Sequence, residues 1–296
     1  MKTIKVGTRG SRLALAQTKQ VTDALQALCP EVNIETVVIR STGDAITDRP
    51  LREIGGSGLF TGALEDALRC GEVDFAVHSM KDLPAALAEG LTLAPPPKRA
   101  DPRDALIGKP GCASLADLPK GAKLGTGSPR RALQIHELRP DLELVPIRGN
   151  VDSRIAKVGG AVDGVVLAAA GLSRLGLTER ISAYFSVDEL LPAPCQGVLA
   201  LELREADREL YALLAQLGDA DTAAAAQAER AFLRATGAGC HAPVGAYCTC
   251  AGDMLTLRGL FGADEQHYVR GSISGARDEA VQLGERLAER LLGELK

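Results

Sequence analysis

The alternation of apolar and polar positions predicts short buried strands followed by amphipathic helices in the first ninety residues. Residues 4–8 and 32–39 are rich in β-branched side chains, which favours strands, and residues 13–28 repeat apolar side chains at helical spacing. Residues 73–77 (VDFAV) predict a buried strand that is closed off by Pro84. This alternation of strands and helices is typical of an α/β fold.

The same order of elements recurs later in the chain. One match pairs residues 6–15 (VGTRGSRLAL) with residues 124–133 (LGTGSPRRAL), and another pairs residues 71–77 (GEVDFAV) with residues 160–166 (GAVDGVV). A third match, between PEVNIETVVIR and PDLELVPIR, lies between these two in both copies. Because the three matches occur in the same order in both copies, they favour two homologous lobes, each built on a parallel sheet.

Beyond the two lobes, the pattern changes to long helices and an antiparallel sheet. Asp221 or Thr222 is expected to cap an Ala-rich helix that ends near residue 235. The β-rich segments that follow, and the amphipathic helix that closes the chain, are predicted at 244–250, 255–261, 267–273 and 277–292. These elements predict a small C-terminal α+β domain.

Runs of proline and other turn formers indicate where the chain crosses between lobes. The first run begins at residues 95–97 and continues to residue 104. The second breaks at Pro192 and Pro194 and then becomes an apolar strand from Val198, which we expect to return to the first lobe. The predicted domains are therefore 1–97 with 195–218 for the first lobe, 98–194 for the second, and 219–296 for the C-terminal domain.

Composition and charge narrow the classes of function. The 296 residues are 46% apolar, which is enough for several cores, while the aromatic share of 3% without tryptophan argues against base stacking on nucleic acid. A net charge of −4 gives no general attraction to polyanions. Seven cysteines at scattered spacings predict a reducing compartment, and no apolar run is long enough for a signal or a membrane span. We expect a soluble, cytoplasmic monomer.

Polar side chains gather where the central strand of the first lobe ends. His78, Ser79, Lys81 and Asp82 follow directly after that strand, at the edge where open α/β sheets place ligands. In the same lobe, Ser11 is expected to cap a helix whose first N–H groups form an anion site beside Arg9 and Arg12. A solvated turn with a surface ion pair is the alternative interpretation of the Lys81–Asp82 stretch.

The second lobe carries a stronger version of the same anion motif. Ser128 is at the predicted N-cap, Pro129 at the first helical position, and Arg130 and Arg131 in the first turn. The helix dipole favours acids at this end, so paired arginines there indicate an anion in front of them. If the strand ends of both lobes face one cleft, the ligand carries several carboxylates or phosphates. The alternative is that individual arginines pair with neighbouring acids.

Cys240 lies on a Gly-flanked loop, GAGCHAPVGAY, after the Ala-rich helix, and it permits three interpretations. It could be a buried small residue, a reactive thiol, or a zinc ligand together with His241, Cys248 and Cys250. The spacing is poor for zinc because adjacent residues rarely reach one metal and a Cys-x-Cys pair on a strand faces opposite ways. We therefore predict no metal site.

Taken together, these motifs resemble the porphobilinogen deaminase (hydroxymethylbilane synthase) family. The matching segments are VGTRGSRLALAQ, GGSGLF, VDFAVHSMKDLP, DPRDALI, GTGSPRR, IRGNVDSR, AAAGLSRLGL and GCHAPVGAY, and they cover essentially the whole chain in order. The resemblance implies two βα lobes like those of periplasmic binding proteins around a cleft, with a three-stranded antiparallel sheet in the C-terminal domain. It also implies an enzyme that joins four porphobilinogen molecules head to tail with loss of ammonia.

The resemblance implies a role for each matched residue. The growing chain would start from a dipyrromethane cofactor attached through a thioether to Cys240. Asp82 would be the catalytic aspartate, whose carboxylate stabilises the positive charge that develops on the pyrrole and helps proton transfer. The residues expected to hold the cofactor's carboxylates are Lys81, Thr126, Ser128, Arg130 and Arg131. Those expected to bind the substrate or the growing chain are Arg9, Ser11, Arg148, Arg154, Arg174 and Gln196.

The sequence also departs from the family pattern at several positions. Ser57 stands where many members have Lys, Cys195 where Gly is usual, and Gly127 where Ser is common, while Thr-Gly-Ala-Gly precedes Cys240. None of these removes a matched catalytic group. Two other classes stay open from the residues themselves: a non-enzymatic two-lobed anion-binding module, and a zinc- or thiol-dependent enzyme that uses the cysteine cluster.

Overall fold

A computed structural model describes residues 3–40, 61–238, 242–264 and 267–295. The chain divides into two compact units, residues 1–99 with 198–223 and residues 100–197 with 224–296. The first unit holds one five-stranded sheet, and the second holds a five-stranded and a three-stranded sheet. The three-domain boundaries expected from the sequence stay a prediction.

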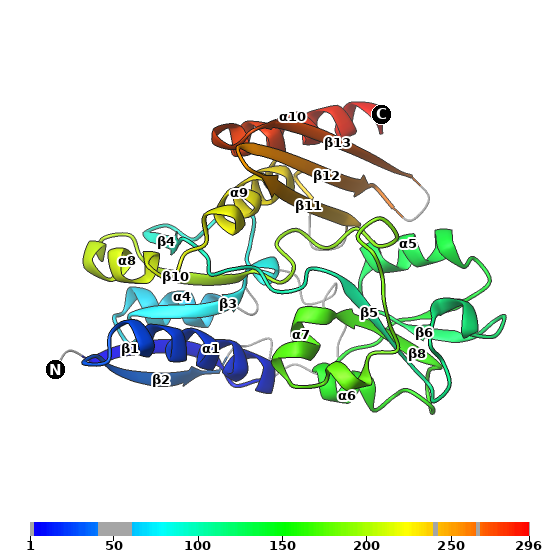
Figure 1. Cartoon of the computed structure of the whole chain (residues 1–296), viewed down its shortest axis with the longest axis horizontal. Helices are drawn as coiled ribbons and strands as arrows, with labels where there is room; N and C mark the ends of the chain where they lie inside the picture. Colours follow the sequence, from blue (N-terminus) through cyan, green and yellow to red (C-terminus); the bar gives the residue numbers. More distant parts are fainter. Residues whose placement is uncertain (1–2, 41–60, 239–241, 265–266, 296) are drawn as a thin grey trace. The chain divides into compact units, whose positions relative to one another are not determined.

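The first unit is a mixed sheet in the strand order β2-β1-β3-β10-β4. Its strands are β1 (Thr3–Arg9), β2 (Asn33–Ile39), β3 (Phe75–Ser79), β4 (Leu91–Ala94) and β10 (Leu199–Arg204). Its helices are α1 (Arg12–Leu28), α4 (Gly62–Arg69) and α8 (Arg208–Ala215), with a 3-10 turn η1 (Met80–Asp82) after β3 (Figure 1). The core of the unit includes Val6, Leu25 and Phe75, all fully buried.

The predicted return of the chain to the first sheet is confirmed, but the expectation of a parallel sheet was wrong for part of it. β1 runs parallel to β2 and β3, whereas β10 runs antiparallel to both β3 and β4. The reason is topological: β10 enters this sheet from the later crossover rather than through a βαβ unit, so the right-handed crossover that enforces parallel strands does not apply.

The second unit repeats this arrangement in the strand order β7-β6-β8-β5-β9. Its strands are β5 (Asp104–Gly108), β6 (Lys123–Gly125), β7 (Glu143–Val145), β8 (Gly164–Ala168) and β9 (Ala183–Tyr184). Its helices are α5 (Pro129–Leu138), α6 (Val151–Ile155) and α7 (Ala169–Arg174), with 3-10 turns η2 (Leu115–Asp117) and η3 (Thr178–Arg180) (Figure 1). Here too three strands, β7, β6 and β8, run parallel to one another. β5 is antiparallel to both of its neighbours, β8 and β9, and takes the place that β10 has in the first sheet.

The internal echo predicted from the sequence is therefore confirmed by the topology, and it extends to packing. A Cβ on Gly7 in β1 would lie 2.9 Å from the Leu64 side chain, and a Cβ on Gly125 in β6 would lie 2.9 Å from the Ile147 side chain. Both distances are shorter than any ordinary contact. Glycine at each position lets a side chain from another part of the unit pack directly against the backbone of that strand.

The C-terminal elements of the second unit form a helix-covered antiparallel sheet. They are α9 (Ala220–Ala235), which begins in the first unit, β11 (Val244–Ala251), β12 (Met254–Gly262), β13 (Tyr268–Ala276), η4 (Arg277–Glu279) and α10 (Ala280–Glu294), with the strands in chain order. Leu283, Leu287 and Leu291 form the buried stripe of α10. The predicted sheet is confirmed. The cap of α9 is Asp219 rather than Asp221 or Thr222, since its Oδ1 accepts from the Thr222 N–H at 2.8 Å.

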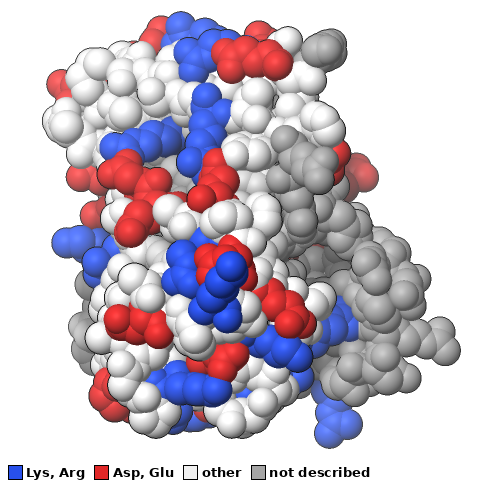
Figure 2. All heavy atoms as spheres, turned by 90° about the vertical axis from the view of Figure 1, so that its right-hand side faces the viewer, with Lys and Arg blue, Asp and Glu red and all other residues white. Residues whose placement is uncertain are grey.

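The predicted α/β fold class with a C-terminal three-stranded sheet is thus confirmed. Within the described ranges, every helix is too short or too polar to cross a membrane. On the face drawn in Figure 2, Lys and Arg side chains are interspersed with Asp and Glu, so a field of one sign does not cover it. Selectivity for anions must therefore come from individually placed cations.

Candidate active site

The carboxyl ends of β1 and β3 in the first unit border a small pocket of about 60 Å³. The residues that line it are Arg9, Ser11, Leu13, Ala14, Gln17, Thr61, Val77, His78, Ser79 and Asp82. Ser11 caps α1 as predicted, because its Oγ accepts from the Ala14 N–H at 3.2 Å. The structure therefore brings Arg9, Ser11 and Asp82 to one pocket, at the sheet edge where the sequence placed them.

Backbone hydrogen bonds fix the turn that carries Asp82, and its side chain takes no part in them. The Met80 N–H donates to the Val198 carbonyl oxygen at 3.0 Å, and Leu83 N–H donates back to the Met80 carbonyl at 3.1 Å. Met80 and Leu83 are buried, whereas Asp82 is exposed and Lys81 is half-buried. Within the described residues the Asp82 carboxylate makes no hydrogen bond or ion pair. A fixed, unpaired carboxylate at a pocket can stabilise a positive charge on a ligand.

A buried acid behind this pocket was missed by sequence reasoning. His78 Nε2 lies 3.0 Å from Glu202 Oε2 on β10, and the two side chains are 5% and 0% exposed. The sequence did carry a signal for it, because Glu202 interrupts the otherwise apolar strand LALEL. Glutamate is almost never fully buried without a partner, so an acid at this position indicates a buried pair. Ser79 is also engaged, because its Oγ accepts from Gln17 Nε2 at 2.7 Å.

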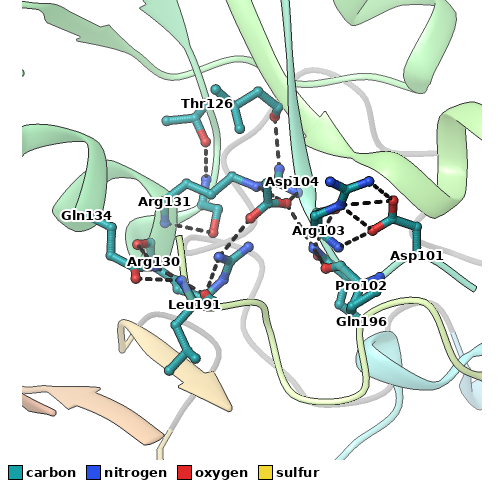
Figure 3. Close-up of polar contacts among 12 residues, drawn as sticks. Asp101, Pro102, Arg103, Asp104, Thr126, Arg130, Arg131, Gln134, Leu191 and Gln196 are labelled. Atoms are coloured by element: carbon teal, nitrogen blue, oxygen red, sulfur yellow. Dashed lines mark hydrogen bonds and ion pairs between the residues drawn. The ribbon is translucent and has the colours of Figure 1, made fainter. Parts of the chain in front are cut away.

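The second unit holds two buried arginines around one buried aspartate (Figure 3). Asp104 Oδ1 accepts from Arg131 Nε at 3.0 Å and Nη2 at 2.7 Å, and Asp104 Oδ2 lies 2.9 Å from Arg130 Nη1. Arg131 Nη1 also donates to the Val166 carbonyl at 3.0 Å. The sequence indicated an anion in front of these arginines, and one such anion is internal: the Asp104 carboxylate.

The charges in this cluster do not cancel. Burial raises the pKa of Asp104, but Arg130 and Arg131 more than offset it and hold that pKa well below its usual range. Burial lowers the pKa of Arg130, and Arg131 adds to this lowering while Asp104 opposes it. Arg130 Nε is buried and has no hydrogen-bond partner among the described residues. Two guanidinium groups against one carboxylate leave one excess positive charge, which can be neutralised by a ligand anion.

Gln196 is fully buried, and its amide is directed at the same aspartate. Its Nε2 donates to Asp104 Oδ1 at 2.9 Å and to the Pro102 carbonyl at 2.8 Å (Figure 3). The sequence predicts that Gln196 binds the substrate, and this role stays a prediction. In this structure its amide orients Asp104.

Arg174, at the end of α7, is the residue whose surroundings most clearly favour binding of an anion. Burial lowers its pKa to about 10, and its Nη2 donates to the Gly197 carbonyl at 2.8 Å. Its Nε is buried without a hydrogen-bond partner, and no carboxylate contacts this guanidinium within the ranges that the structure describes. A buried cation that lacks a counter-charge is unfavourable unless a ligand supplies one.

The remaining predicted residues of the second unit have local contacts. Ser128 Oγ accepts from the Arg131 N–H at 3.4 Å as the cap of α5, and Thr126 Oγ1 accepts from the Ser128 N–H at 3.2 Å. Arg154 Nε donates to the Gly149 carbonyl at 2.7 Å, and Arg148 is half-buried. These four residues thus lie in the loops and first turns that follow β6 and β7.

Cys240, His241 and Ser57 lie outside the described residues. Among the residues that are described, no group of three or more His, Cys, Asp or Glu side chains is placed to hold a metal ion. Cys195 has a φ of +60°, a conformation that favours the glycine usual in the family. Its N–H and that of Cys248 donate to the two oxygens of buried Glu229, at 2.5 and 2.8 Å, a tether that sequence reasoning did not find.

The fold and these sites define a class: an α/β protein whose second unit has buried arginines suited to an anionic ligand. Its first unit has a pocket with a carboxylate, Asp82, that is unpaired among the described residues. The family model described as "Porphobilinogen deaminase, dipyromethane cofactor binding domain" matches residues 4–212, and "Porphobilinogen deaminase, C-terminal domain" matches residues 223–293. The chain belongs to the porphobilinogen deaminase family, as the motifs had indicated.

Curated relatives agree with this assignment. The chain is 52% identical over 291 residues to porphobilinogen deaminase of Syntrophus aciditrophicus, which covers 98% of this chain and 95% of the relative. It is 51% identical over 290 residues to the enzyme of Roseiflexus castenholzii, with the same two shares. Among solved structures, a methionine-binding protein is similar at a TM-score of 0.48 and 13% identity, over 73% of this chain and 89% of that one.

Proposed function

We propose that this chain is a hydroxymethylbilane synthase that joins four porphobilinogen molecules head to tail, with loss of one ammonia for each. Membership of the family gives the reaction. The observation that carries the proposal to these residues is the excess positive charge of Arg130 and Arg131 over Asp104, together with Arg174, which no carboxylate contacts among the described residues. Each porphobilinogen brings an acetate and a propionate. The product therefore gathers negative charge as it grows, which arginine forks are suited to neutralise.

The dipyrromethane cofactor of the family fits the donor set of this chain. Its carboxylates can take up the excess charge beside Asp104, where Arg130 Nε has no partner among the described residues. The residues that would hold it are Lys81, Thr126, Ser128, Arg130 and Arg131, with Cys240 as the point of covalent attachment. When bound, the cofactor supplies a pyrrole carbon on which the chain starts.

Asp82 has the catalytic role in this proposal. Loss of ammonia leaves a positive charge on the substrate's pyrrole, and a fixed carboxylate stabilises this charge as it develops and assists proton transfer. The residues proposed to bind the substrate and the growing chain are Arg9, Ser11, Arg148, Arg154, Arg174 and Gln196. The exposure of Asp82 and its lack of a partner within the described chain support this assignment.

Intact mass of the purified chain tests the proposal. We expect the polypeptide mass plus two porphobilinogen-derived units, and Cys240→Ala should show the bare polypeptide. Cys70→Ala, which removes an exposed cysteine, is the matched control and should keep the added mass. A wild-type chain at the bare mass, unchanged after incubation with porphobilinogen, would instead favour an anion-binding module.

Compartment and assembly are part of the proposal as well. We propose a cytoplasmic monomer, since the substrate and product are small anions and the reaction needs no second chain or membrane. Light scattering during size-exclusion chromatography should give the mass of a single chain across a hundredfold range of concentration. A dimer mass at the lowest concentration would contradict the monomer.

A further inference from the structure

The buried pair His78–Glu202 in the first unit is not explained by the roles assigned above. Both residues lie on neighbouring antiparallel strands, where His78 pairs with Ala200 and Glu202 pairs with Ala76, so their side chains share one face of the sheet. The two atoms that meet are His78 Nε2 and Glu202 Oε2, at 3.0 Å. The carboxylate is therefore buried directly beside one nitrogen of the imidazole ring.

The second unit shows that the fold itself does not need this pair. By the sequence echo and the strand registers, His78 corresponds to Leu167 on β8, and Glu202 corresponds to Ile107 on β5. Leu167 and Ile107 are 4% and 1% exposed, so the same two positions are filled there by apolar side chains. A buried polar pair is retained where an apolar pair suffices for the architecture, which points to chemistry rather than packing.

The pair also reaches the pocket that contains Asp82. His78 lines that pocket together with Arg9, Ser11 and Asp82, while Glu202 lies behind it. The two atoms are close but complete no hydrogen bond within the described residues. The negative charge of the Glu202 carboxylate beside Nε2 still favours the hydrogen on that nitrogen, which leaves the lone pair on the second ring nitrogen, Nδ1. Nδ1 has no hydrogen bond to any described residue. A carboxylate that fixes the tautomer of a histidine is the arrangement by which enzymes prepare a general base.

We propose that His78 is a catalytic base of the polymerisation and that Glu202 is its positioning residue; this deepens, and rests on, the proposed function. Each addition forms a C–C bond between the aminomethyl carbon of the incoming porphobilinogen and the free α carbon of the accepting pyrrole. The C–N bond breaks and its electron pair leaves with ammonia. The α proton then passes to His78 Nδ1, its bonding pair restores the aromatic ring, and the proton is released to ammonia or water.

The first test replaces the pair by its counterpart from the other sheet. The double variant His78→Leu, Glu202→Ile should fold, because the second unit packs the same side chains at these positions. Its turnover should fall by about 100-fold or more, the scale of a lost general base. His267→Gln is the matched control, because His267 also pairs with a carboxylate, Asp264, but is exposed. The control should turn over at the wild-type rate.

An isotope effect separates a base from a residue that merely supports the fold. The isotope effect is the rate with ordinary porphobilinogen divided by the rate with porphobilinogen deuterated at its free α carbon. This ratio should be larger for His78→Gln than for the wild type, because proton removal becomes limiting in the variant. Glu202→Gln should give an intermediate ratio. Turnover close to wild type in the double variant, or lower turnover with an unchanged ratio, would overturn the proposal.

A second measurement does not depend on turnover. The chain has four histidines, so ¹⁵N signals of the ring nitrogens can be assigned by comparing wild type with His78→Gln. We expect His78 with a protonated Nε2 and an unprotonated Nδ1 in the holoenzyme. A proton on Nδ1 and none on Nε2 would refute the role of His78 as a base while leaving the proposed function intact. Failure of the proposed function itself would appear as a wild-type chain without cofactor mass or product.

Discussion

The two five-stranded sheets have the same strand order, but they bury their acids at different places. In the first unit Glu202 is buried against His78, at a position that is Ile107 in the second unit. In the second unit Asp104 is buried against two arginines, at a position that is Leu199 in the first. Apolar positions supply the framework that the two sheets share, and each unit carries its own buried charges on it. The first is suited to handling protons and the second to binding anions.

The largest effect is expected at Asp82, on the side of the first unit. Asp82→Asn keeps the shape of the turn but removes the charge that stabilises the cationic pyrrole, so turnover should fall by about 1,000-fold. Intact mass should still show the cofactor when the variant is supplied with preformed tetrapyrrole. Asp23→Asn, which removes an exposed acid paired with Lys19, is the control and should leave turnover unchanged. Turnover near the wild-type rate in Asp82→Asn would refute the role.

Asp104 should give the largest loss of stability in the second unit. Asp104→Asn leaves Arg130 and Arg131 buried without a carboxylate, which should lower the free energy of unfolding by about 3 to 5 kcal/mol in urea titrations. Asp66→Asn, at an exposed pair with Arg69, should cost less than about 1 kcal/mol. Equal losses in the two variants would mean that the arginine cluster is not held by Asp104.

The same aspartate predicts how acid affects stability. The pKa of Asp104 is held below its ordinary value of 3.8, so its contribution to stability is complete above that pH and is lost as pH falls toward the lower pKa of the folded state. Unfolding free energy should therefore decline steeply below about pH 4, and less steeply in Asp104→Asn. Parallel pH profiles for the two proteins would contradict the assignment.

Arg174 should affect binding more than folding. Arg174→Gln removes a half-buried cation that lacks a carboxylate partner in the described chain, so stability should not fall, while KM for porphobilinogen should rise about 10- to 100-fold. Arg180→Gln, on the nearby 3-10 turn, is a control that should leave KM unchanged. Loss of stability without a change in KM would make Arg174 a structural residue.

The smallest predicted effect concerns the two helix caps that the repeat shares. Ser11→Ala and Ser128→Ala each remove an oxygen that accepts from the first helical turn, and each should lower the free energy of unfolding by about 1 kcal/mol. The exposed Ser173→Ala should change it by less than half of that. A clear difference between the two caps would show that the repeat has diverged in its local energetics as well as in its charges.

The sequence was sufficient for what depends on local pattern. The strands, the caps at Ser11 and Ser128, the repeat and the position of Asp82 follow from periodicity and capping rules. It was not sufficient for partners chosen by tertiary contact. Asp104 lies 27 residues before Arg131, and Gln196 lies 92 residues after Asp104, so neither contact leaves a local signal. For the same reason, Glu229 was not recognised as a buried acid. Glu202 did leave a local signal, as an acid inside an apolar strand, but its partner His78 did not follow from it.

The most direct test of the central claim is a mass ladder. Holoenzyme mixed with limiting porphobilinogen should show masses that rise in equal steps, each the mass of one porphobilinogen less one ammonia, up to four steps. Asp82→Asn should stay at the starting mass over the same time. A wild-type chain that binds porphobilinogen without any covalent step would contradict the account.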